Sequence, residues 1–286
     1  MRKMRIFTHM KLIADGGSTK TKWALLSENA TAEVFTSAGL NPLMLDDEAI
    51  RQRIAAEVVL RIGERRVDEV WFYGAGCIDS VLGRMAGLLR RSLGGAECRV
   101  GSDMLGAARA LCGHRRGIAC VLGTGSNSCL YDGEMVEDNV SPLGYILGDE
   151  GSGAVIGRRL ISDVYKRQLP GELCGHFGRW LGMSRNEVIE RVYRRPEANV
   201  FLASLTRFVA ENISEAPLRE LVTDEFERFL RRNVMVYEGA EMLPVHFTGS
   251  LAAVFAPQLR DALDRCGLHC GRIEPDPLPG MIEYHK

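Results

Sequence analysis

The sequence lacks any long apolar run: no segment of its 286 residues approaches the ~20 consecutive apolar residues that a membrane-spanning helix needs. Its first ten residues hold basic side chains but no apolar stretch of signal-peptide length. It also lacks an excess of either charge, because 36 lysines and arginines face 37 acidic residues. This balance gives no reason to expect nucleic acid or an anionic membrane as a partner. We therefore expect a cytoplasmic protein that acts on small molecules.

Cysteine is present but shows no disulfide framework. Eight cysteines are scattered along the chain, and a chain of this length, 46% hydrophobic, can build two cores without disulfides. We expect reduced thiols. Cys266, His269 and Cys270 form the one tight group, but three ligands at this spacing do not match the common zinc patterns. Plain packing is the favoured interpretation of that group.

The first part of the chain alternates between strand-like and helix-like patterns. Residues 11–15 and 21–27 predict two strands around a glycine turn, and residues 32–37 complete a meander. Further elements are expected in this order: a helix over 46–62, a strand over 69–73, a helix over 78–93, a strand over 98–101 and a helix over 104–112. The segment 113–117, rich in glycine, arginine and histidine, suits a domain boundary.

The second part begins as the first does, with predicted strands over 118–122 and 127–132 around a glycine turn. The elements expected after them are a strand near 134–137, helices over 153–168, 184–193, 199–213 and 218–238, a strand over 244–248 and a helix over 250–265. Ser184 and Glu187 form a capping-box pattern. The repetition suggests duplicated halves, residues 1–116 and 117–274, with 275–286 as a candidate helix that returns to the first half.

The first glycine turn has the groups that a phosphate-binding hairpin needs. The run Asp15-Gly16-Gly17-Ser18-Thr19-Lys20-Thr21 combines glycines, free amides, hydroxyls and a cation. A strand follows it, whereas a Walker A loop or a Rossmann fingerprint leads into a helix. Taken alone, the run is explained equally well as a tight polar hairpin.

Two further segments repeat this chemistry. The turn Gly123-Thr124-Gly125-Ser126 lies between two predicted strands of the second half, as the first glycine turn does in the first half. Two such hairpins can clamp the phosphates of a nucleotide from opposite sides. Later in the chain, Gly249-Ser250 follows a strand at the start of a helix, a geometry that can lie against adenosine. Together the three segments favour a nucleotide site.

In this order and spacing, the three segments resemble the two phosphate motifs and the adenosine motif of the BadF/BadG/BcrA/BcrD ATPase family. The runs Gly-Thr-Gly-Ser-Asn at 123–127 and Gly-Asp-Glu-Gly-Ser at 148–152 resemble its N-acetylglucosamine kinase branch in particular. The resemblance spans about residues 11–286. It implies an α/β protein with two ribonuclease H-like, actin-like ATPase lobes and a central nucleotide cleft. It also implies a kinase that uses ATP to phosphorylate a hydroxyl of an N-acetylated amino sugar, with N-acetylglucosamine as the first expectation.

The resemblance assigns roles to the motif residues. It implies that ATP is bound by Gly16, Gly17, Ser18, Thr19, Lys20, Gly123, Thr124, Gly125, Ser126, Gly249 and Ser250. Asp103 matches the catalytic carboxylate, which takes the proton of the sugar hydroxyl as that hydroxyl attacks the γ-phosphate. The alternative for Asp103 is an N-cap of the helix that begins at Met104. The magnesium ion is expected at Asp15, with Glu150 in reserve.

The same resemblance implies sugar contacts from both halves. The residues concerned are Asn41, Asp103, Thr124, Gly144 and Asp149. Asn41 is alternatively a turn residue before Pro42, and Asp149 is alternatively a cap for a helix near Gly151. One departure affects the identity of the sugar: mammalian members carry Gly-Trp-Gly where this sequence reads Pro-Leu-Gly-Tyr at 142–145, so the aromatic contact is missing or moved to Tyr145.

Two other functions remain open at this point. One branch of the family comprises ATPase activators of acyl-CoA dehydratases and reductases, which hold an iron-sulfur cluster with two cysteines per subunit. The other is a sensor that binds sugar or nucleotide without turnover. A homodimer is a candidate assembly, because the long helices predicted over 199–238 can pack internally or against a second copy.

Overall fold

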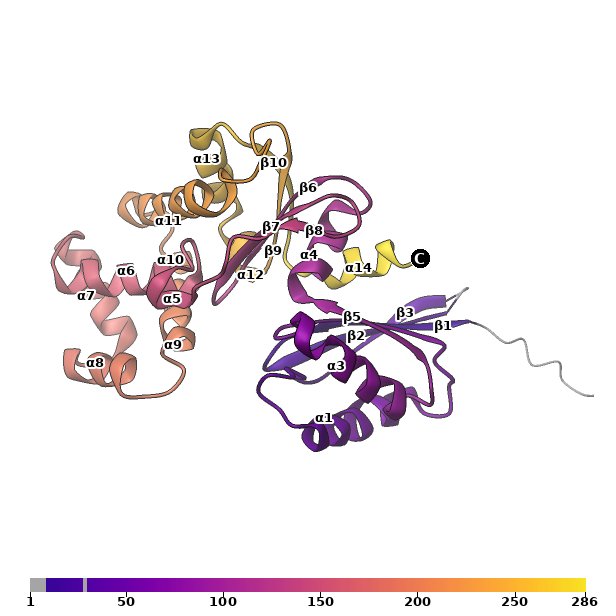
Figure 1. Cartoon of the computed structure of the whole chain (residues 1–286). Helices are drawn as coiled ribbons and strands as arrows, with labels where there is room; N and C mark the ends of the chain where they lie inside the picture. Colours follow the sequence, from indigo (N-terminus) through magenta and orange to yellow (C-terminus); the bar gives the residue numbers. More distant parts are fainter. Residues whose placement is uncertain (1–8, 28–29) are drawn as a thin grey trace, which may run out of the picture. The chain divides into compact units, whose positions relative to one another are not determined.

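The computed structural model describes residues 9–27 and 30–286 (Figure 1). The basic residues before position 9, noted in the sequence, lie outside the described part. The chain forms two compact units: Met1–Gly113 together with Pro277–Lys286, and His114–Asp276. Each unit is built on one five-stranded mixed sheet covered by helices.

The sheet of the first unit has the order β3-β2-β1-β4-β5. The strands are β1 (Met10–Gly16), β2 (Lys20–Ser27), β3 (Ala30–Ala38), β4 (Glu69–Gly74) and β5 (Glu97–Ser102). The first three form an antiparallel meander, and β4 and β5 run parallel to β1. The middle of β1 is buried on both faces, at Leu12, Ile13 and Ala14, as a central strand with helices on both sides requires.

Helices cover both faces of this sheet (Figure 1). On one face lie α1 (Asp47–Arg53), the π-helical turn η1 (Ile54–Val59), α2 (Leu60–Ile62) and α3 (Asp79–Ser92); on the other lie α4 (Asp103–Cys112) and α14 (Leu278–Tyr284). The single α-helix predicted over 46–62 is therefore wrong in its middle, where a π turn interrupts it. That turn places the carboxylate of Glu57 where it accepts a hydrogen bond from the Ala38 N–H at the end of β3.

The second unit repeats the strand path of the first. Its sheet has the order β10-β9-β6-β7-β8, with β6 (Gly117–Leu122), β7 (Ser126–Tyr131), β8 (Val136–Asp138), β9 (Pro244–Thr248) and β10 (His269–Glu274). Again three antiparallel strands are followed by two strands parallel to the first. This repetition confirms the prediction of two ribonuclease H-like lobes. The sequence analysis missed β10, because this edge strand is mostly exposed and has no apolar alternation.

The helices of the second unit lie between β8 and β9 and between β9 and β10. They are α5 (Gly144–Leu147), α6 (Gly153–Tyr165), α7 (Gly171–Leu181), α8 (Arg185–Tyr193), α9 (Ala198–Ser204), α10 (Thr206–Glu211), α11 (Ala216–Phe229), the π turn η2 (Leu230–Val234), α12 (Ser250–Val254) and α13 (Ala256–Cys266). The capping box at Ser184 and Glu187 is confirmed.

The structure departs from the predicted helices of this unit. The helix predicted over 199–213 is broken at Leu205, whose N–H bonds three residues back to Leu202. The helix predicted over 218–238 leaves α-helical geometry at Leu230. The sequence analysis missed α7 because its three glycines lower helix propensity, and the helix is held in place by its buried Leu173 and Phe177.

The C-terminal helix α14 is anchored to the first unit by a buried polar cluster. The ring of His285 stacks on Trp71 with centroids 4.3 Å apart, and its Nε2 lies 2.8 Å from the Tyr73 hydroxyl. Arg109 donates to the same hydroxyl at 2.7 Å, and the Lys11 ammonium donates to the His285 carbonyl at 2.8 Å. Burial, together with the positive charges of Arg109 and Lys11, lowers the pKa of His285 to about 4. The folded protein therefore keeps this imidazole neutral.

Within the described residues, no helix combines the length and the apolar character that crossing a membrane would need.

Protonation of His285 is expected to weaken the first unit. Since the pKa of this imidazole falls from 6.5 to about 4 on folding, the unfolded chain binds the extra proton between these values, and the free energy of unfolding falls as pH is lowered through this window. Above pH 6.5 this group has no effect. His285→Gln should flatten the pH dependence of unfolding measured in urea between pH 7 and 5. His269→Gln, at an exposed histidine, is the control and should leave the wild-type slope unchanged.

Candidate active site

Strand register brings three loops of the first unit to one edge of its sheet. Gly16, Gly74 and Ser102 are the last residues of the parallel strands β1, β4 and β5, and they are direct neighbours in register. The segments that follow these strands therefore start side by side. In open α/β sheets this carboxyl edge is where ligands bind.

The turn between β1 and β2 is a tight hairpin with an exposed tip. Gly17 donates its N–H to the Lys20 carbonyl at 2.9 Å, while Ser18, Thr19 and Lys20 are exposed. In the described part of the chain, the amides of Ser18 and Thr19 have no acceptor. Gly39 supports the turn from behind, because its N–H donates to the Thr19 carbonyl at 2.9 Å. The tip can thus offer two amides, two hydroxyls and an ammonium to an anion.

Asn41 is tied to this hairpin. Its side-chain N–H donates to Ser18 Oγ at 2.8 Å, and its Oδ1 accepts from the Leu43 N–H at 2.9 Å. The side chain is largely buried, at 9% exposure. Asn41 therefore does organise the turn before Leu43, as the alternative interpretation held, and it also fixes the position of Ser18. Its contact with a sugar stays a prediction.

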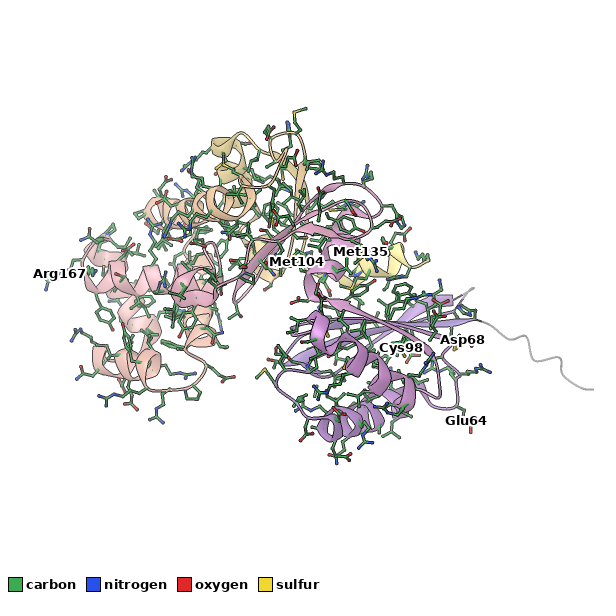
Figure 2. The ribbon with its side chains drawn as sticks, in the orientation of Figure 1. Glu64, Asp68, Cys98, Met104, Met135 and Arg167 are labelled. Atoms are coloured by element: carbon green, nitrogen blue, oxygen red, sulfur yellow. The ribbon has the colours of Figure 1, made fainter. Side chains whose placement is uncertain are left out.

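Asp103 is the first residue of α4, directly after β5; Met104, labelled in Figure 2, follows it. The N-cap interpretation of Asp103 is wrong, because Ser102 caps the helix by accepting the Leu105 N–H at 3.1 Å. The Asp103 carboxylate accepts the Met104 N–H at 2.9 Å and is exposed. Desolvation by the surrounding protein nevertheless raises the pKa of Asp103, against the hydrogen bonds from backbone N–H groups. A carboxylate with a raised pKa is a better proton acceptor.

Asp15 lies one residue before the end of β1. It is half-buried and stands opposite Lys22 in the antiparallel pair of β1 and β2. No group of three or more histidine, cysteine, aspartate or glutamate side chains among the described residues is placed to hold a metal ion. A magnesium ion often takes only one or two protein carboxylates and completes its shell with water and phosphate oxygens. Asp15 fits that donor set.

The second unit builds its turn on a helix. The carbonyls of Gly123 and Thr124 accept the N–H groups of Gly153 and Ala154, the first two residues of α6, at 2.8 and 3.2 Å. The positive end of the α6 dipole therefore lies directly beneath the turn. Across the turn, Gly123 donates to the Gly125 carbonyl at 3.0 Å, and the Thr124 side chain is exposed. This arrangement favours an anion at the turn.

Asp149 lies beside the same turn. Desolvation raises the pKa of its carboxyl, opposed by hydrogen bonds with the backbone of Gly144 and Ser126. Its backbone has a left-handed φ of 53°. The prediction that Asp149 caps the next helix is wrong, because Ser152 accepts the Val155 N–H and is the N-cap of α6. Asp149 and Gly144 are thus brought together next to Ser126.

A cavity of about 320 Å³ opens beside this group. Its lining combines polar residues (Ser126, Asn127, Ser141, Asp149, Glu150, Arg232 and Asn233) with the apolar Val140, Pro142, Leu143 and Leu147. Tyr145 is not among the residues that line the cavity. It packs against the hydrophobic core instead, so the aromatic contact predicted to move to this residue is absent from the cavity wall.

The sequence analysis missed Arg232 and Asn233. Both lie on the π turn η2, and both contact Glu150: Arg232 Nε is 2.5 Å from one carboxylate oxygen and Asn233 Nδ2 is 3.4 Å from the other. Desolvation acts to raise the pKa of Glu150, but these contacts and a backbone hydrogen bond outweigh it and lower the pKa. Glu150 is thus already engaged by a cation in the structure.

The third motif stands at the end of β9. Thr248 lies in register with Val121 of β6, and Gly249 follows it directly over the Leu122 carbonyl. The Thr248 hydroxyl is buried and has no partner among the described residues, and the same holds for the Thr21 hydroxyl at the start of β2. Buried hydroxyls without a partner are rare, and a polar ligand at these edges would supply one.

Comparison with solved structures identifies the family. A "putative N-acetylglucosamine kinase" from Porphyromonas gingivalis is 43% identical, covers 96% of this chain and 98% of its own, and superposes with a TM-score of 0.91. The chain belongs to this N-acetylglucosamine kinase-like family. Neither a protein-family model nor a curated protein matches the sequence.

More distant structures share the fold of the family. A "putative N-acetylglucosamine kinase" from Chromobacterium violaceum is 19% identical over 97% of this chain and 99% of its own, with a TM-score of 0.74. A ROK family glucokinase from Streptomyces griseus, solved with glucose and AMPPNP, is 14% identical over 96% of this chain and 97% of its own, with a TM-score of 0.57.

Gly39 leaves no room for a side chain behind the first turn. An added Cβ would lie 2.1 Å from the Ser18 carbonyl oxygen and 2.7 Å from that of Gly17, so the hairpin backbone would have to move. Gly39→Ala should destabilise the first unit by about 1–3 kcal/mol and accelerate amide exchange at Gly17, whose N–H is hydrogen-bonded within the turn. Gly83→Ala, in an open position of α3, is the control and should be neutral or stabilising. Unchanged exchange at the turn in Gly39→Ala would contradict the packing described here.

Proposed function

We propose that this protein is an ATP-dependent kinase that phosphorylates a hydroxyl of an N-acetylated amino sugar, with N-acetylglucosamine as its first candidate. The observation that carries the proposal is the 43% identity, over nearly the whole of both chains, to a protein named as an N-acetylglucosamine kinase. The Gly-Thr-Gly-Ser-Asn and Gly-Asp-Glu-Gly-Ser runs favour its placement in the BadF/BadG/BcrA/BcrD ATPase family. We place it in the cytoplasm, with sugar and ATP as its partners and a homodimer as a candidate assembly.

In this proposal the two units are the two ATPase lobes, and each supplies one phosphate turn. The turn at 16–20 offers amides, hydroxyls and Lys20, and the turn at 123–126 offers amides above the positive end of α6. Gly249 and Ser250 lie against adenosine. Magnesium at Asp15 would supply charge neutralisation for the transferred phosphoryl group. The bound AMPPNP of the Streptomyces griseus glucokinase supports ATP as the nucleotide of this fold.

The sugar would be held by Asn41 and Asp103 from the first unit and by Thr124, Gly144 and Asp149 from the second. The cavity beside Asp149 suits an acetamido group, because its apolar residues Val140, Pro142, Leu143 and Leu147 can contact the methyl and its polar residues can bond the amide. Asp103 accepts the proton of the attacking hydroxyl. Because Ser102 carries out the capping of α4, the Asp103 carboxylate is left exposed for that task.

The proposal is tested by coupled ADP release with magnesium and ATP against N-acetylglucosamine, N-acetylmannosamine, N-acetylmuramic acid, glucosamine and glucose. We expect turnover with an N-acetylated sugar and little with glucosamine or glucose, since these lack the acetyl methyl. Equal turnover with glucose would remove the cavity beside Asp149 from its proposed role. No ADP release with any of these sugars, in a protein that binds ATP, would overturn the kinase proposal.

Asp103→Asn should lower kcat by about 10²- to 10⁴-fold with little change in ATP affinity, because the amide cannot accept the proton. The acidic limb of the kcat/KM profile should also be lost: in the wild type, activity falls as pH is lowered through the raised pKa of Asp103, where the carboxyl becomes protonated. Asp79→Asn changes another exposed aspartate that begins a helix of the same unit, and it should leave both readouts unchanged. Near-normal turnover in Asp103→Asn would show that another group is the base.

A further inference from the structure

The loop that follows β4 touches all three functional segments of the first unit. The N–H of Ala75 donates to the Gly16 carbonyl at 2.7 Å, which ties the loop to the end of β1 and the first turn. Cys77 is buried near Asp103, and its pKa is raised to about 12 by burial and by the Asp103 charge, so the thiol stays protonated. Between these two residues, Gly76 faces Asn41. The loop thus lies among the hairpin, the carboxylate and the buried amide.

Gly76 is in contact with the amide of Asn41. Its φ is +76°, and a Cβ built on it would lie 2.1 Å from Asn41 Oδ1, 2.8 Å from Cγ and 3.1 Å from Nδ2. The first two are distances that real Cβ atoms essentially never show, and the third is tighter than most. The backbone of residue 76 therefore forms the wall against which the whole amide group of Asn41 rests, and any side chain there would displace it.

The other contacts of Asn41 leave part of its bonding capacity unused. Its Nδ2 gives one hydrogen to Ser18 Oγ, and its Oδ1 takes one from the Leu43 N–H. A side-chain amide has two hydrogens and two lone pairs, so one of each remains after these bonds. Held by Ser18, Leu43 and the wall at Gly76, the amide is fixed in orientation before any ligand binds. A fixed polar group binds a hydroxyl without the cost of ordering the side chain first.

We infer that Gly76 is a positioning residue for substrate: it sets the place of the Asn41 amide and thereby the affinity of the site for a sugar hydroxyl. The inference rests on the proposed function, in which Asn41 contacts the sugar. Gly76 itself touches no substrate and acts through Asn41. The absence of a side chain at position 76 is consequently a requirement for sugar affinity.

Steady-state kinetics separate this role from a general effect on folding. Gly76→Ala should raise KM for the sugar about tenfold, which corresponds to the loss of one hydrogen bond, and should change kcat and KM for ATP by less than about twofold. Gly63→Ala is the matched control, because Gly63 has a similar φ of +65° but no atom within 4 Å of the added Cβ. It shares the positive φ and should leave KM for the sugar unchanged. If both variants have the same KM, the inference is wrong while the kinase proposal stands.

Thermal unfolding supplies a readout that does not depend on activity. Gly76→Ala should lower Tm more than Gly63→Ala does, because the displaced Asn41 loses its bonds to Ser18 and Leu43. In an Asn41→Ala background this excess should disappear. An excess that persists there would show that Gly76 does not act through Asn41 and would overturn the inference. Absence of sugar turnover in the wild type would count against the proposed function, and the unfolding cycle would still decide whether Gly76 positions Asn41.

Discussion

The register of three parallel strands is the constraint on which the first unit depends. Gly16, Gly74 and Ser102 end β1, β4 and β5 side by side, so the phosphate-type turn, the loop at Gly76 and the Asp103 carboxylate all begin at one edge. A shift of one residue in any pair would turn alternate side chains to the other face of the sheet. The three strands are paired residue by residue through the buried centre of the sheet, in this one register. The geometry of the edge is thus a consequence of the core.

The second unit reaches a similar edge by different means. Its turn at 123–126 is held from below by the first N–H groups of α6, and the long segment between β8 and β9 helps to line a cavity beside the turn. One sheet plan therefore carries two kinds of turn. In the first, backbone atoms of the chain pack against one another with no room for side chains. In the second, the N-terminus of a helix lies beneath the turn and a cavity opens beside it.

Local sequence could predict the strands and turns because alternating burial and glycine punctuation are local signals. It placed both hairpins and the carboxylate at Asp103 correctly in the chain, since each follows a strand with a clear pattern. It could not predict Arg232 and Asn233, because the π turn that brings them to Glu150 depends on how α11 packs. The contact between Gly76 and Asn41 could likewise not be predicted from the sequence. It joins two loops whose proximity exists only after the sheet has formed.

The wrong N-cap prediction at the start of α4 concerns the chemical state of Asp103. An acidic residue just before an apolar helix is the usual pattern of an N-cap, and a capping carboxylate has its oxygen occupied by helix N–H groups. Here Ser102 takes that task one residue earlier. Asp103 is left at the first helical position, where it accepts only backbone N–H groups close to it, including that of Met104, and remains exposed with a raised pKa. A serine hydroxyl can cap a helix without charge. Because Ser102 caps α4, the carboxylate of Asp103 stays available at the sheet edge.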